Sequence, residues 1–120
     1  MFNVSKNGII EVVRGDSFKV ALFINRGTDL CPERYILKEG EYIYFGVMEP
    51  NYSFENAIVR KKYSNEDLNK DKDVVISFNS EDTVNLQPGK YFYEVKAVIL
   101  DEDGNEVVNT IIPKREFFIL

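Results

Sequence analysis

The stretch that decides the fold spans residues 86–100 and reads Leu86-Gln87-Pro88-Gly89-Lys90-Tyr91-Phe92-Tyr93-Glu94-Val95-Lys96-Ala97-Val98-Ile99-Leu100. After its Pro-Gly turn, side chains on alternate positions form two distinct sets, which is the spacing of a β-strand. One set is wholly apolar and comprises Tyr91, Tyr93, Val95, Ala97 and Ile99. We therefore predict a long central strand from Tyr91 to Leu100.

The turn before this strand predicts a more specific architecture. Leu86, Pro88, Gly89 and Tyr91 resemble the corner of immunoglobulin-like sandwiches, where a tyrosine hydroxyl binds upstream backbone and fixes the chain crossing. We expect Tyr91 to supply this hydroxyl because it directly follows the turn, and Tyr93 is the alternative. These four residues are therefore assigned to the fold and not to an activity.

Further strands are expected on both sides of this segment. Alternating hydrophobicity predicts strands at residues 17–25, 42–48 and 73–79, and β-branched or aromatic residues predict weaker ones at 8–13, 57–63, 106–112 and 116–120. A short helical turn is expected at residues 64–70, and a loop containing Pro32 at residues 29–37. Together they predict an all-β, immunoglobulin-like antiparallel β-sandwich of seven or eight strands, with at most one short helical turn, in a single domain spanning residues 1–120.

Composition weighs against several classes of function. The chain has 15 Lys and Arg against 20 Asp and Glu, a formal net charge of -5, which is the wrong sign for binding nucleic-acid phosphates. It has no histidine, the commonest general base and metal ligand, and its single cysteine, Cys31, has no histidine to activate it. No apolar run approaches the length of a membrane span, and no signal peptide is recognisable. We expect no catalysis, no cofactor, no nucleic acid and no membrane.

Two motifs have a functional and a structural reading. Arg14-Gly15-Asp16 spells a tripeptide that integrin-type receptors recognise, but glycine followed by aspartate between strands is ordinary turn chemistry. Asp101, Asp103, Asn105 and Glu106 resemble the opening of a calcium loop, yet the glutamate required at the twelfth position is replaced by Ile112. We interpret both motifs as turns and expect no metal site.

Several stretches occur in an order that resembles a known group of proteins. They are Arg14-Gly15-Asp16-Ser17-Phe18, Leu37-Lys38-Glu39-Gly40 before Ile43-Tyr44-Phe45, Asp82-Thr83 with Leu86-Gln87-Pro88-Gly89-Lys90-Tyr91-Phe92-Tyr93-Glu94-Val95, and Thr110-Ile111-Ile112-Pro113 with Phe117-Phe118-Ile119. Together they resemble small β-sandwich proteins encoded by tailed phages and prophages of Gram-positive bacteria, including the N-terminal domain of baseplate upper proteins.

This resemblance implies a non-catalytic virion structural protein, a module of the baseplate, tail, neck or capsid. It would be made in the host bacterial cytoplasm, reside in the virion, and bind other virion proteins or further copies of itself in a homo-oligomer. The alternative is a carbohydrate-binding β-sandwich module, because exposed tyrosines stack on sugar rings. The absence of tryptophan weakens that alternative.

Strand periodicity also predicts a binding surface. If Ile43, Phe45 and Val47 face the core, their neighbours face away from it, and the same holds around Tyr93 and Val95. The outward apolar residues are then Tyr42, Tyr44, Met48, Phe92, Val98 and Leu100. We expect them to form one interface patch, unless the C-terminal segment around Phe118 and Leu120, or residues 29–37, fold over it.

Overall fold

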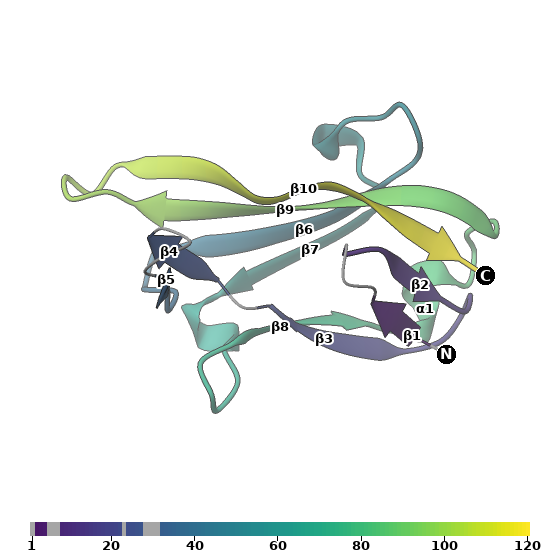
Figure 1. Ribbon diagram of the computed structural model, residues 1–120, viewed down its shortest axis with the longest axis horizontal. Coiled ribbons are helices and arrows are strands. Elements are labelled where there is room, and N and C mark those ends of the chain that lie inside the picture. Colours follow the sequence, from purple (N-terminus) through teal and green to yellow (C-terminus); the bar gives the residue numbers. More distant parts are fainter. Residues whose placement is uncertain (1, 5–7, 23, 28–31) are drawn as a thin grey trace.

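One layer of the computed structural model is a six-stranded sheet, and the structure describes residues 2–4, 8–22, 24–27 and 32–120 (Figure 1). The order across this sheet is β1 (Phe2–Val4), β2 (Ile10–Val12), β10 (Glu106–Ile119), β9 (Gly89–Leu100), β6 (Tyr42–Met48) and β7 (Val59–Ser64). Its neighbouring strands are antiparallel, except that β2 and β10 run parallel. The predicted strand after Pro88 is thus central, with β10 on one side and β6 on the other.

The second layer is the antiparallel pair β3 (Phe18–Leu22) and β8 (Val74–Phe78), which lies below the large sheet in Figure 1. A short hairpin, β4 (Asn25–Gly27) and β5 (Pro32–Arg34), lies beneath the end of the β9–β10 hairpin. Four neighbouring strands of the large sheet, in the order β10-β9-β6-β7, face the pair β3-β8. This strand order corresponds to that of variable-type immunoglobulin sandwiches. The expected all-β sandwich is therefore present.

Aromatic rings hold the two layers together. Phe78 stacks on Phe18 at 4.5 Å between ring centres, and meets Phe45 edge-on at 5.6 Å. It also stacks on Phe117 at 5.8 Å. Alternate residues of the strands predicted at 17–25, 42–48, 73–79 and 91–100 form the core. Among them Phe18, Ile24, Phe45, Val47, Ile76, Phe78, Tyr93 and Val95 are buried, while Val20 and Leu22 are partly buried at its margin. The margin is open there because β3 pairs with β8 alone among the described strands.

The helical turns exceed the single one expected. The described residues form η1 (Phe54–Asn56), η2 (Asn65–Asp67) and a four-residue α1 (Ser80–Thr83). The predicted turn is η2, where the Ser64 amide donates to the Asp67 carboxylate at 2.8 Å. At α1 the Asn79 amide donates likewise to the Asp82 carboxylate at 2.7 Å, so the same pattern of cap residue and acid begins this turn. None of the described helices is long and apolar enough to cross a membrane.

Two strand boundaries also differ from expectation. The strands expected at 106–112 and 116–120 are one strand, β10, which passes Pro113 through register shifts between Thr110 and Ile112 and between Ile112 and Arg115. Such bulges accommodate a residue that lacks a backbone N–H. The expected loop at 29–37 contains β5. After β5, the Tyr35 amide donates to the Ile24 carbonyl at 2.8 Å. Residues 29–31 lie outside the described residues.

The tyrosine corner is confirmed, with Tyr91 in the expected role. The Tyr91 hydroxyl donates to the Gln87 carbonyl at 2.7 Å, four residues upstream. Tyr93, the alternative, donates instead to the Gly8 carbonyl and so ties β9 to the residues before β2. Gly89 has a φ of +151°, a conformation that favours glycine, where the chain leaves the turn and enters β9.

Replacing Tyr91 by Phe removes only the corner hydroxyl. We expect Tyr91→Phe to lower the free energy of unfolding by about 1 kcal/mol, the usual contribution of one hydrogen bond. Urea denaturation followed by circular dichroism measures this change, and Tyr52→Phe, at a tyrosine that is 52% exposed, is the matched control. Equal stability of the two variants would contradict a stabilising role for the corner.

Candidate functional site

The candidate site is the outer face of the six-stranded sheet, turned away from β3 and β8. Strand register places Tyr42 opposite Val98, Tyr44 opposite Lys96, and Met48 opposite Phe92. β6 and β9 therefore lie side by side in one sheet, as the predicted interface requires. The register alone would make the six expected residues neighbours on one face.

Met48 and Val98 correct this expectation because both are buried, with exposed fractions of 0% and 8%. Met48 ends β6 directly before the β6–β7 connection, which stands on the outer side of the sheet in Figure 1. Val98 lies in the middle strand between Tyr42 and Val108, whose side chains flank it. These two residues are therefore removed from the predicted surface.

The β6–β7 connection covers the sheet where a glycine allows close approach. A Cβ atom on Gly46 would lie 2.8 Å from a ring carbon of Phe54, so only glycine lets the η1 turn sit this close. The Lys114 ammonium donates to the Tyr52 carbonyl at 2.9 Å and anchors the connection to β10. Of the two covers expected from the sequence, Phe118 pairs with Lys90 at the end of β9, and residues 29–31 lie outside the described residues.

The connection divides the expected patch into two parts. The first part, which we call the tyrosine face, comprises Tyr42, Tyr44, Lys62 and Lys96. Its tyrosines are half-buried with ring centres 6.5 Å apart, and the Lys62 ammonium lies 4.2 Å from the Tyr42 ring centre and 5.6 Å from that of Tyr44. Leu100, also half-buried, lies at the end of β9 beyond Val98. The tyrosine face is a small surface that combines aromatic rings with positive charge.

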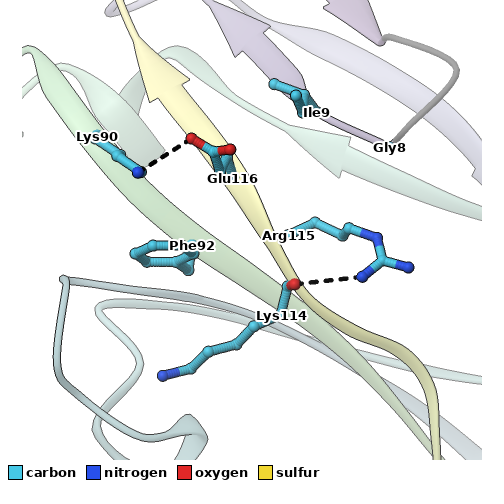
Figure 2. A pocket seen from close by; sticks show the side chains of 7 residues that line it. All are labelled: Gly8, Ile9, Lys90, Phe92, Lys114, Arg115 and Glu116. Carbon is cyan, nitrogen blue, oxygen red and sulfur yellow. Dashed lines mark hydrogen bonds and ion pairs between the residues drawn. The ribbon is translucent and has the colours of Figure 1, made fainter.

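Phe92 lies in the second part, an open groove of about 850 Å³. Figure 2 shows the residues that line it: Gly8, Ile9, Lys90, Phe92, Lys114, Arg115 and Glu116. The ammonium groups of Lys90 and Lys114 lie 5.3 and 5.9 Å from the Phe92 ring centre, and Lys90 pairs with Glu116 at 3.2 Å. Arg115 points to the opposite side of β10 from Lys114 in Figure 2. We call this the basic groove, since three cations and one carboxylate line it.

The two ambiguous motifs form turns. Gly15 adopts a φ of +83°, and its amide donates to the hydroxyl of the buried Thr83 at 2.9 Å. The Asp101 carboxylate accepts hydrogen bonds from the amides of Asp103 and Asn105 at 2.9 and 2.8 Å, which closes the β9–β10 hairpin. Within the described part of the chain, no three His, Cys, Asp or Glu residues are grouped to hold a metal ion. Cys31 lies outside the described residues.

Glu41 is a buried carboxylate that sequence reasoning missed. It is 1% exposed and accepts hydrogen bonds from the Tyr35 hydroxyl at 2.7 Å and from the amides of Lys38 and Leu100, each at 2.9 Å. Burial has the largest single effect on its pKa and would raise it, but the hydrogen bonds from Tyr35, Leu100 and Lys38 together lower the pKa below the ordinary value. In the sequence, the residues around Gly40 indicate only a turn, and they give no sign that the next residue, Glu41, is buried.

This geometry gives Glu41 a structural role. Its donors come from the segment before β6 and from the last residue of β9, so the carboxylate ties these two segments together. A carboxylate held as an anion by several donors is poorly suited to deliver a proton near neutral pH. Glu41 therefore supports the end of the sheet that carries the tyrosine face.

Comparisons with known proteins give no match from which a function could be inferred. The chain matches no family model, no curated protein and no solved structure. The chemistry and geometry of its surfaces are therefore the basis for the functional argument.

Replacing Glu41 by Gln should make stability depend less on pH. A carboxylate with a lowered folded-state pKa stabilises the fold above about pH 4.3, the ordinary pKa of glutamate, and this contribution is lost as the pH falls through the lowered value. We expect Glu41→Gln to cost about 1–3 kcal/mol at pH 7, and less at pH 3. Denaturant titrations at both pH values, with the exposed Glu39→Gln as control, measure this difference, and an equal cost at both would contradict it.

Proposed function

We propose that this chain is a non-catalytic structural protein of a phage virion, a module of the baseplate, tail, neck or capsid that acts through protein–protein contacts. The observation that carries the proposal is the tyrosine face. Tyr42 and Tyr44 are presented side by side on β6, the strand that β7 and β9 flank on both sides. Rigid aromatic side chains of this kind are typical anchors of protein interfaces.

The charge around the tyrosines favours a protein partner. Lys62 places its ammonium over the Tyr42 ring, and Lys96, opposite Tyr44, carries a second cation that lies 3.8 Å from the Glu94 carboxylate. A protein partner with carboxylates or carbonyl groups would complement these cations while its apolar side chains pack on the rings. The resemblance of the sequence to small phage β-sandwich proteins supports a virion as the place of this contact.

The same feature weighs against the carbohydrate-binding alternative. Sugar rings stack on open aromatic faces, and the Lys62 ammonium lies 4.2 Å from the centre of the Tyr42 ring. Binding a sugar on that face would require Lys62 to move away. The alternative thus predicts that removing Lys62 strengthens binding to glycans.

Assembly of virions tests this proposal. In a phage that lacks the gene, a plasmid would supply either the original chain, the double variant Tyr42→Ser and Tyr44→Ser, or the control Tyr52→Ser on the β6–β7 connection. We expect the original chain and the control to be present in purified particles, and the double variant to be reduced about tenfold or more because it lacks both anchors. Immunoblots of gradient-purified particles measure the amount incorporated.

Two outcomes would overturn the proposal. One is absence of the original chain from purified particles. The other is glycan binding by the original chain that Tyr42→Ser abolishes and Lys62→Ala strengthens, which would favour the carbohydrate-binding module. If the double variant does not melt cooperatively, Tyr44→Glu replaces it and is expected to reduce incorporation through charge alone.

A further inference from the structure

The first half of β10 is an open edge of the six-stranded sheet. β9 pairs with one side of β10 from Glu106 onward, but β2 meets the other side only at Phe117–Ile119. Among the described residues, no strand pairs with that second side over residues 106–112. In Figure 1 the β9–β10 hairpin extends well beyond β2. The backbone groups along this edge are open to another strand.

The direction of these backbone groups follows from the hairpin. The Asp101 amide donates to the Asn105 carbonyl at 2.9 Å, and the Leu100 amide donates away from β10, to Glu41. Because antiparallel pairs alternate between bonded and non-bonded, Val107 and Asn109 direct their N–H and C=O groups to β9. Glu106, Val108 and Thr110 therefore direct theirs to the open edge.

The side chains of this edge favour pairing. Residues 106–112 read Glu-Val-Val-Asn-Thr-Ile-Ile, which is rich in β-branched residues and has a single charge. Val107 and Val108 are 41% and 64% exposed. Natural edge strands are usually protected by lysine, proline or bulges, and here the first proline and the register shifts come after Thr110. The regular part of the edge has none of these protections.

We propose that a second copy of this chain pairs antiparallel with β10 at this edge, about a two-fold axis near Asn109. Charge complementarity identifies the occupant. The hairpin tip carries Asp101, Glu102 and Asp103, whereas the other end of the open edge reaches Lys114 and Arg115 at the basic groove. Antiparallel self-pairing brings the acidic tip of each copy against the basic groove of the other, so the same attraction occurs twice.

The side chains on the inner side of the edge agree with this arrangement. Val107, Asn109 and Ile111 line a groove of about 480 Å³ together with Ile24, Tyr35, Ile99, Leu100 and Thr110. With the axis at Asn109, Val107 of one copy lies opposite Ile111 of the other, so the two apolar grooves join and are covered. Val108 then pairs with Thr110 of the second copy, and both direct their backbone groups to the edge. This inference does not depend on the proposed function, which uses the tyrosine face.

Sedimentation equilibrium of the full chain tests this dimer. We expect a concentration-dependent dimer whose dissociation constant rises about tenfold or more in Val108→Pro, because proline removes an outward N–H without breaking the pairing with β9. Val84→Lys, which changes a 45% exposed valine on the C-terminal side of α1, is the control and should dimerise as the original chain does. A monomer at every concentration, or an unchanged dimer in Val108→Pro, would overturn the proposal.

Charge reversal tests the partner and leaves the strand unaltered. Glu102→Lys with Asp103→Lys should weaken the dimer, and so should Lys114→Glu with Arg115→Glu. An equimolar mixture of the two double variants should restore association, because both tip-to-groove contacts of the mixed dimer pair opposite charges, one as in the original chain and the other with both signs reversed. Failure to restore association would contradict the antiparallel arrangement, even if Val108→Pro proved too unstable to measure.

A disulfide tests the position of the axis. In a Cys31→Ser background, Asn109→Cys should form a cross-linked dimer under mild oxidation, since Cα atoms of a non-bonded antiparallel pair lie about 4.5 Å apart. Val84→Cys in the same background should remain monomeric on a non-reducing gel. Equal cross-linking of both variants would show random collision and would contradict the proposed axis.

Discussion

The ring of Phe78 is the contact on which the rest of the structure depends. It belongs to the small β3–β8 layer, yet it stacks on Phe117 of β10 and meets Phe45 of β6 edge-on. A two-stranded layer buries little surface by itself, so a few large rings must hold it against the six-stranded sheet. Once these rings are buried, one face of β6 and β9 is committed to the core and the other is free for contacts.

The outer face of the six-stranded sheet is shaped by Gly46, a glycine within β6. Gly46 has no side chain to fill its position, and the β6–β7 connection uses that space for Phe54. The connection then separates the tyrosine face from the basic groove and is held to β10 through Lys114. A single glycine in a central strand therefore decides which aromatic residues remain available to a partner.

β10 joins two environments in one strand. Its last residues, Phe117–Ile119, lie between β9 and β2 and include the buried Phe117 and Ile119, whereas its first half pairs with β9 alone among the described strands. The register shifts around Pro113 mark the change between them. The first half leads from the acidic hairpin tip, and the strand beyond the shifts reaches Lys114 and Arg115 at the basic groove.

The sequence by itself determined the features that depend on neighbours along the chain. Period-two alternation identified β6 with its exact bounds, the Pro88-Gly89 turn identified Tyr91 as the corner residue, and Ser64 with Asp67 identified η2. Only the tertiary structure decided that Met48 and Val98 are buried, that Glu41 gathers donors from distant segments, and that β10 continues past Pro113. The physical reason is that alternation places a side chain on a face, whereas burial on that face depends on which remote segment packs over it.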